Sequence, residues 1–273
     1  MSESDSAAAA REFARLVTIM ATLRGPDGCP WDREQTIDSL KPFVLEETYE
    51  VLEAIDRHDH DSLREELGDF LFEAVFLAQL EAEHGRFTIA DSIRSIADKL
   101  VRRHPHVFDR GQGAAAVDSA DAVRVRWEEI KAKERSETHG RDLKKSLLSG
   151  IAPTLPALLR AFHIGTRAAS VGFDWARTED VVAKIEEEIG ELREVVDSPG
   201  RAEEEMGDLL FAIANLSRKL GIEPETALRK ANDKFTKRFT AMEQRLAADG
   251  RSVSALSLEA LEAEWQRSKV SPG

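Results

Sequence analysis

Apolar side chains recur every three to four positions along most of the chain, which is the spacing of amphipathic helices. Phe13, Leu16 and Met20 mark the first helix, and Gly25-Pro26 ends it. A sustained alternation with the two-residue period of a β-strand is missing from the sequence. The pattern therefore predicts an all-α protein, with helices over residues 11–24, 38–57, 62–84, 88–104, 120–135, 157–170, 181–197, 201–220, 224–250 and 257–270.

The same order of motifs occurs twice. An EExxE motif at residues 46–50 and an ExxD motif at 66–69 reappear at 187–191 and 205–208. Each copy is preceded by a glycine loop with a tryptophan, Trp31 or Trp175, and is followed by an Asp-Lys pair and a second tryptophan. An internal duplication explains this order. We therefore expect two tandem helical bundles, over residues 11–135 and 157–270, joined by a Pro/Gly-containing hinge at 136–156.

Acidic residues of the second copy lie where its helices are expected to be buried. At about 100° per residue, Glu188 falls inside the apolar arc of its helix and Glu191 at the edge of that arc. Glu205 lies beside the apolar stripe of the next helix, and Asp208 lies at its border. A buried carboxylate is costly unless it is compensated, and we expect no basic residue among these four. A single ExxE motif would indicate only a solvated face, but its duplication favours a hard divalent cation, Mg²⁺ or Mn²⁺.

Basic and aromatic residues further along each copy suit a phosphate and a base. Lys234 and Arg238 lie four positions apart, so both reach one side of a helix and can clamp phosphates. Trp265 and Trp175 offer flat faces on which any nucleobase can stack. The competing interpretations are a pair of surface cations and tryptophans of a core or an interface.

Composition narrows the function classes. The net charge of −13 argues against binding to nucleic-acid polymers, which relies on basic surface. Apolar runs stay far shorter than a membrane span, and the acidic opening residues lack the basic start of a secretory signal. Cys29 is the single cysteine, so an intrachain disulfide is impossible and a cytoplasmic location is expected. The sequence also lacks the P-loop motif GxxxxGK[ST].

Several segments together resemble the MazG family of nucleoside triphosphate pyrophosphohydrolases, within the all-α pyrophosphohydrolases. They are GCPWD, LEETYEVLEAI, ELGDFLF, DKLVRRHPHVF, RAASVGFDW and NDKFTKRF. The resemblance covers residues 16–269 and implies hydrolysis of NTPs or dNTPs to the monophosphate and pyrophosphate with magnesium. It also implies a helical bundle in each domain and a homodimer.

The resemblance assigns roles to the matching residues of the second copy. The implied metal ligands are Glu188, Glu191, Glu205 and Asp208. Glu187 is expected to orient water, Lys234 and Arg238 to stabilise the departing pyrophosphate, and Asn232 to contact substrate. The first-copy counterparts, expected to bind metal or nucleotide, are Glu46, Glu47, Glu50, Glu66, Asp69, Lys99, Arg103 and Trp127. Ala97 stands where the second copy has Asn232, so we expect the second copy to be the main catalytic one.

Two other functions fit the same acids. A dUTPase-like or phosphoribosyl-ATP pyrophosphohydrolase would use them on one substrate only. A metal-stabilised helical regulator would bind nucleotide or protein without turnover. Pyrophosphate release across a panel of nucleotides separates the three.

Overall fold

The computed structural model describes residues 3–108 and 146–270. Every regular element within these two ranges is a helix, which confirms the predicted all-α class. The chain divides into two compact units, Met1–Glu137 and Thr138–Gly273. The predicted helix over 120–135, which carries Trp127, and residues 136–145 of the predicted hinge lie outside the described residues. The domain boundaries therefore stay predictions.

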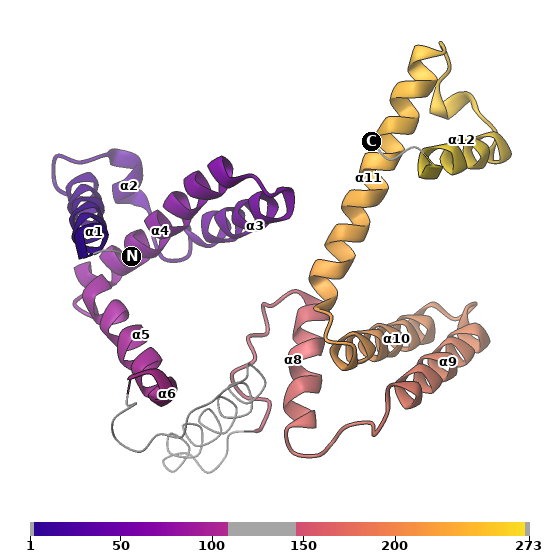
Figure 1. Cartoon of the computed structure of the whole chain (residues 1–273), viewed down its shortest axis with the longest axis horizontal. Coiled ribbons are helices and arrows are strands. Elements are labelled where there is room, and N and C mark those ends of the chain that lie inside the picture. Colours follow the sequence, from indigo (N-terminus) through magenta and orange to yellow (C-terminus); the bar gives the residue numbers. More distant parts are fainter. Residues whose placement is uncertain (1–2, 109–145, 271–273) are drawn as a thin grey trace. The chain divides into compact units, whose positions relative to one another are not determined.

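The first unit is built around a pair of helices, α3 and α4, which pack against each other. His58 in the left-handed conformation (φ 55°) and the N-cap Asp59 turn the chain between them. α1 and α5 both contact α4, and the core gathers Met20, Leu40, Val75, Phe76 and Leu80. The helices (Figure 1) are α1 (Glu3–Leu23), α2 (Pro30–Glu34), α3 (Lys41–Arg57), α4 (His60–Glu83), α5 (Ile89–Arg103) and α6 (Pro105–Phe108).

The second unit repeats this pair with α9 and α10, and α8 packs against α10. Gly165 of α8 makes that contact close, because a Cβ there would lie 2.2 Å from Oδ1 of the buried Asn215 in α10. α11 contacts α8 near one end, and α12 packs against the other half of α11. The elements are α8 (Ala157–Ala169), α9 (Thr178–Val195), α10 (Pro199–Lys219), α11 (Pro224–Ala248), the 3₁₀ turn η1 (Val253–Ala255) and α12 (Leu258–Val270).

Three local predictions were wrong. α10 begins at Pro199, so the expected turn at Ser198-Pro199-Gly200 is instead the start of a helix. Proline suits the first helical position because its fixed φ is already helical and its missing N–H would be unpaired there. Trp31 lies on the short helix α2 rather than in an open loop. α1 begins at Glu3 rather than at residue 11, because the alanines at 7–10 are strong helix formers.

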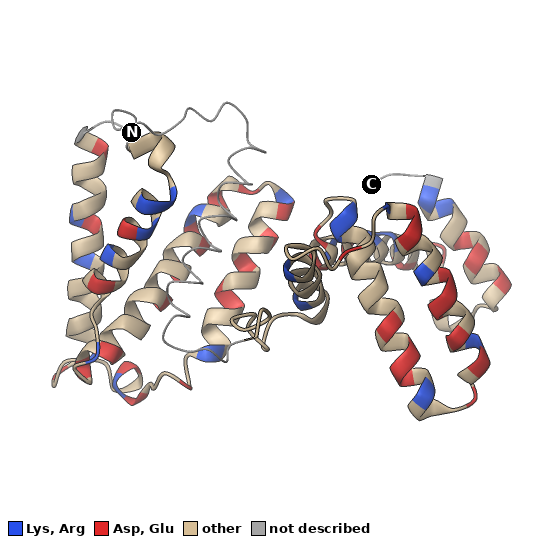
Figure 2. Ribbon diagram, turned by 90° about the horizontal axis from the view of Figure 1, so that it is seen from below, with Lys and Arg blue, Asp and Glu red and all other residues tan. Residues whose placement is uncertain are grey.

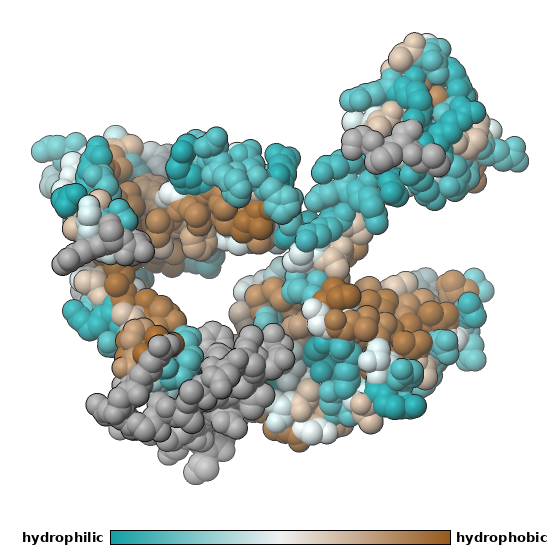
Figure 3. Space-filling view, in the orientation of Figure 1, coloured by the Kyte–Doolittle hydropathy of each residue, from teal (hydrophilic) through white to brown (hydrophobic). Residues whose placement is uncertain are grey.

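Each helix pair leaves apolar side chains open to solvent. Figure 3 shows brown, hydrophobic residues gathered over α9 and α10 and over α3 and α4. In the second unit the exposed residues include Val182, Val196, Met206, Leu210, Phe211 and Ile213, and in the first Tyr49, Leu67, Phe70 and Leu71. The described helices include none that is both long and apolar enough to cross a membrane.

Candidate metal centres and active site

The helix pair of the second unit brings three acids together. Glu188 projects from α9, and Glu205 and Asp208 project from α10, one helical turn apart. One carboxylate oxygen of each lies within 4.8 Å of the other two. Glu188 is only 4% exposed, and its Oε2 is buried without a hydrogen-bond partner. A buried, unpartnered carboxylate oxygen facing two further acids fits a divalent cation.

Lys184 corrects one expectation for this site. Its Nζ lies 2.8 Å from a carboxylate oxygen of Glu187 and 2.8 Å from one of Glu188, so a basic residue does stand among the acids. The lysine sits one turn before Glu188, and its long stem carries the ammonium along that face of α9. The hydrogen bonds that its ammonium donates to the two carboxylates raise the pKa of Lys184. The four-residue spacing was visible in the sequence, and it was the signal that could have found this residue.

Glu191 and Glu187 lie beside the three-acid group rather than within it. Burial, followed by the negative charges of Glu188 and Glu205, raises the pKa of Glu191, so its carboxylate lies within electrostatic reach of the group. Glu187 is exposed and bonded to Lys184. Metal ligation by Glu191 and water orientation by Glu187 stay predictions.

The first unit holds a matching group on α3 and α4. Carboxylate oxygens of Glu47, Glu66 and Asp69 lie within 4.8 Å of one another. Burial, together with the charges of neighbouring acids, raises the pKa of Glu47 to about 7. Burial and then the charge of Glu50 raise the pKa of Glu66, so Glu50 also faces the group. Figure 2 shows acidic residues in red along the helices of both units.

The two basic residues predicted to bind phosphate lie on another helix of the second unit. Lys234 and Arg238 belong to α11, and Lys234 and the neighbouring Asn232 are exposed. Within the described part of the chain, neither a hydrogen bond nor an ion pair joins Lys234 or Arg238 to the acids of α9 and α10. Their first-copy counterparts Lys99 and Arg103 lie on α5. Phosphate contacts by these residues stay predictions.

Trp265 lines an apolar pocket between α11 and α12. The pocket has a volume of about 320 Å³ and is lined by Phe235, Phe239, Met242, Val253, Leu258, Leu261, Glu262 and Trp265. The ring of Trp265 is half-buried, with its centroid 4.9 Å from that of Phe235. Beside it, Glu264 is buried among Arg245, Arg251 and Arg267, which fasten α12 in place. The pocket offers flat aromatic surface, and Lys234 is the residue of α11 next to its lining residue Phe235.

Trp175 is fixed at the far end of α10. Asp174 accepts a hydrogen bond from Arg218 (3.2 Å) and pairs with Lys219 (2.8 Å), while Lys219 donates to the carbonyl of Trp175. Lys219 follows Asp208 by eleven positions, which is about 16 Å of helix. The loop is thus fastened well away from the acids, and base stacking by Trp175 stays a prediction.

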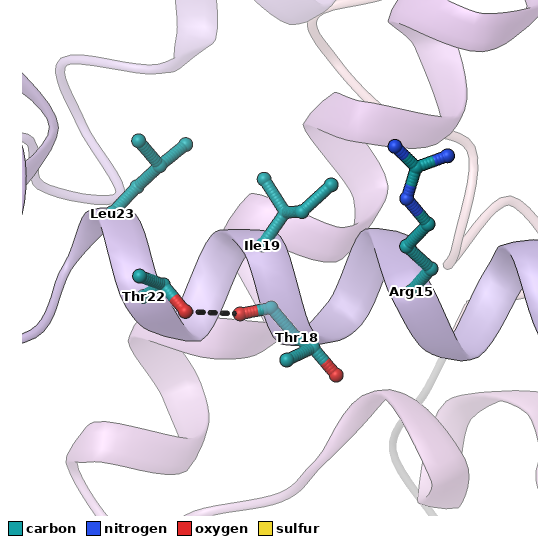
Figure 4. A pocket seen from close by; sticks show the side chains of 5 residues that line it. All are labelled: Arg15, Thr18, Ile19, Thr22 and Leu23. Carbon is teal, nitrogen blue, oxygen red and sulfur yellow. Dashed lines mark hydrogen bonds between the residues drawn. The ribbon is translucent and has the colours of Figure 1, made fainter.

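A second pocket, on α1, has no ligands for a cation. It measures about 380 Å³ and is lined by Arg15, Thr18, Ile19, Thr22 and Leu23. The five side chains stand along one helix (Figure 4), and the Thr22 hydroxyl donates to the carbonyl of Thr18 at 2.8 Å. The pocket is a shallow, mostly apolar stretch of helix surface that lacks the chemistry of the acidic groups.

Fold and acids together define an all-α protein with two acidic centres of the kind that hold divalent cations. The MazG nucleotide pyrophosphohydrolase domain matches residues 35–108 and again residues 177–241, so each match contains one EExxE and one ExxD motif. The chain belongs to the MazG family of nucleotide pyrophosphohydrolases, and it is a hydrolase with two copies of that domain.

Relatives cover almost the whole chain. The nucleoside triphosphate pyrophosphohydrolase/pyrophosphatase MazG of Thermotoga maritima is 48% identical over 257 residues, which are 94% of this chain and 95% of that protein. The nucleoside triphosphate pyrophosphohydrolase of Escherichia coli K12 is 49% identical over 263 residues, 94% of this chain and 97% of that protein. A Mycobacterium tuberculosis protein of the same name is 37% identical over 158 residues, 57% of this chain and 45% of that protein.

Proposed function

We propose that this protein hydrolyses nucleoside triphosphates and deoxynucleoside triphosphates to monophosphate and pyrophosphate, with magnesium as its cofactor and manganese as a substitute. The observation that carries the proposal is the group of Glu188, Glu205 and Asp208 within 4.8 Å, with a buried carboxylate oxygen left unpartnered. The names of the relatives that span the chain support the same reaction. Removal of spent or unwanted nucleotides from the cellular pool is the role that suits it.

In this proposal the acidic residues and Lys184 of the second unit have separate roles. Glu188, Glu191, Glu205 and Asp208 would hold the cation, which when bound neutralises triphosphate oxygens and lowers the pKa of a coordinated water. Lys184 compensates the charge of Glu188 before the substrate arrives. Its ammonium would then pass to the phosphates. Glu187 would orient the attacking water by hydrogen bonding.

Residues of α11 and α12 serve the other parts of the nucleotide. Lys234 and Arg238 would bind the departing pyrophosphate, Lys234 as a point charge and Arg238 as a fork. Asn232 would hydrogen-bond the substrate, and Trp265 would stack on the base in the pocket next to Phe235. Base stacking tolerates every nucleobase, so a broad substrate range follows.

The second unit is the main catalytic one in this proposal. It has Lys184 and Asn232, where the first unit has Phe43 and Ala97 at the corresponding positions. The first unit therefore lacks one cation beside its acids and one polar substrate contact. Its acids remain in place, so it keeps the ability to bind a cation.

A homodimer completes the proposal. The apolar side chains left open on α9 and α10 gather on one exposed surface, and such surfaces often mark contacts with another protein. A second copy of the same surface would cover it symmetrically. We place the protein in the cytoplasm, where the single free cysteine Cys29 would stay reduced.

The proposal is tested by pyrophosphate release from standard and modified nucleotides in the presence of magnesium. Glu188→Gln and Asp208→Asn should each reduce turnover to background while the far-ultraviolet circular dichroism stays that of the unaltered protein. Glu194→Gln is the matched control, because Glu194 is an exposed acid of the same helix α9. Full activity of either site variant, or of the unaltered enzyme in excess chelator, would contradict the proposal, and turnover of one nucleotide only would indicate a single-substrate enzyme.

A further inference from the structure

The apolar pocket between α11 and α12 has a charged residue in its lining. α12 contributes Leu258, Leu261, Glu262 and Trp265 at the spacing i, i+3, i+4 and i+7, so the four share one face of the helix. Among the described residues around the pocket, Glu262 alone is charged, and the others are aliphatic or aromatic. A polar group in a mostly apolar pocket is the kind of group that fixes the orientation of a ligand.

The carboxylate of Glu262 keeps room for a further hydrogen bond. Within the described ranges, it accepts a hydrogen bond at Oε1 from the side-chain amide of Gln266, one turn further along α12, and Oε2 stays open. The first copy of the repeat has Arg124 three residues before Trp127, at the place that Glu262 occupies before Trp265. The acid is therefore a feature of the second copy and not of the repeat.

The size and walls of the pocket suit a nucleobase. Its volume of about 320 Å³ is at the lower end of the range for small-molecule pockets, which fits a base better than a whole nucleoside triphosphate. Trp265 and Phe235 supply aromatic walls, with ring centroids 4.9 Å apart. A base that stacks on the indole presents its edge to the side chains around that ring, and Glu262 is the charged one among them.

We propose that Glu262 selects, among the nucleotides that the enzyme hydrolyses, those whose base carries an exocyclic amino group. This inference rests on the proposed function and on the stacking of the base on Trp265. An ionised carboxylate only accepts hydrogen bonds. Adenine and cytosine offer an amino donor where hypoxanthine and uracil have a carbonyl oxygen, which a carboxylate repels. Stacking keeps the substrate range broad, and Glu262 ranks the substrates within it.

The experiment compares kcat/KM within two pairs of nucleotides, CTP with UTP and ATP with ITP, whose rings are equal in size and differ at this group. The unaltered protein should prefer the amino-bearing member of each pair about tenfold, the effect of one hydrogen bond to a charged group. Glu262→Gln should bring both ratios close to one and raise the turnover of UTP and ITP, because an amide donates as well as accepts. Glu259→Gln is the matched control, an exposed acid of α12 outside the pocket lining, and should keep both ratios.

Calorimetric binding of CMP and UMP gives the same comparison without turnover. A failure of hydrolysis would contradict the proposed function, while the two affinities would still decide the role of Glu262. Equal affinities in the unaltered protein, or a preference for CMP that survives in Glu262→Gln, would overturn the proposal. Trp265→Ala should weaken both monophosphates, and unchanged affinities would place the base elsewhere and overturn it as well. Loss of the preference in Glu262→Gln, with the thermal midpoint unchanged, is the result that supports the assignment.

Discussion

At the scale of single residues, the duplicated motif predicts the acids of each group but not the side chains next to them. The duplication singled out Glu188, Glu205 and Asp208 and their counterparts, and the structure brings each set together, while their metal-binding role stays a prediction. Lys184 was missed because it lies outside the EExxE and ExxD motifs, although it is one helical turn from Glu188. Whether such a neighbour points at the acids depends on which helix packs on that face, and the motif does not contain this information.

Lys184 makes the stability of the second unit depend on metal. Lys184→Met removes the partner of buried Glu188 and should lower the free energy of unfolding in chelator by about 1–3 kcal/mol. Magnesium should close most of that gap, because the cation takes over the compensation of the carboxylate. Urea unfolding of both proteins, with chelator and with magnesium, measures the effect. An equal deficit under both conditions would show that the lysine stabilises α9 independently of the metal site.

Glu47 predicts a pH dependence in the first unit. Its folded pKa of about 7 lies above the ordinary value of 4.5, so the folded state holds the proton more tightly than the unfolded state. The resulting stabilisation is complete below about pH 4.5 and is lost as the pH rises through about 7. In chelator, the thermal midpoint should therefore fall across this window, and Glu47→Gln should flatten the change. A Glu47→Gln profile as steep as that of the unaltered protein would assign the dependence to other groups.

Whole elements were predicted better than their ends. The 3.6-residue period located the long helices, and a capping box of Thr88 and Asp91 begins α5 next to the predicted start at residue 88. The start of α10 was missed because Ser-Pro-Gly is typical of turns as well as of helix starts, and only the packing of α9 on α10 decides between them. With α10 starting at Pro199, Glu205 lies two residues deeper in the helix than the sequence predicted.

The α11–α12 pair predicts the effect of removing Trp265. Because the ring lines an apolar pocket and contacts Phe235, Trp265→Ala should weaken substrate binding by about 1–3 kcal/mol for purines and pyrimidines alike. Trp265→Phe keeps a stacking surface and should retain most of the affinity. The Michaelis constant for several nucleotides, measured beside thermal unfolding, separates binding from packing. An unchanged Michaelis constant with a lowered midpoint would make Trp265 a packing residue only.

At the scale of the molecule, the apolar face on α9 and α10 predicts self-association. The sequence showed these side chains as the buried stripes of amphipathic helices, and it could not show that α8 covers only part of them. Ile213→Glu places a charge on the open face, 38% exposed at this position, and should shift the protein toward monomer in sedimentation analysis. Glu243→Gln, on the exposed face of α11, is the control. A monomeric unaltered protein would contradict the dimer.

The duplication also predicts how the work is divided between the units. Each unit has its own helix pair, core and acidic group, so each should fold as a separate fragment. A fragment that begins at Ser146 should be soluble and keep most of the pyrophosphate release, because it contains Lys184, the acids of α9 and α10, and all of α11 and α12.

A fragment that ends at Glu137 should fold and bind manganese but turn over nucleotide slowly or not at all. It lacks the counterparts of Lys184 and Asn232, and Ala97→Asn should recover at most a small part of the activity. Circular dichroism of both fragments and rates per mole of protein provide the comparison. A first-unit fragment as fast as the full chain, beside an inactive second, would reverse the assignment of the catalytic site.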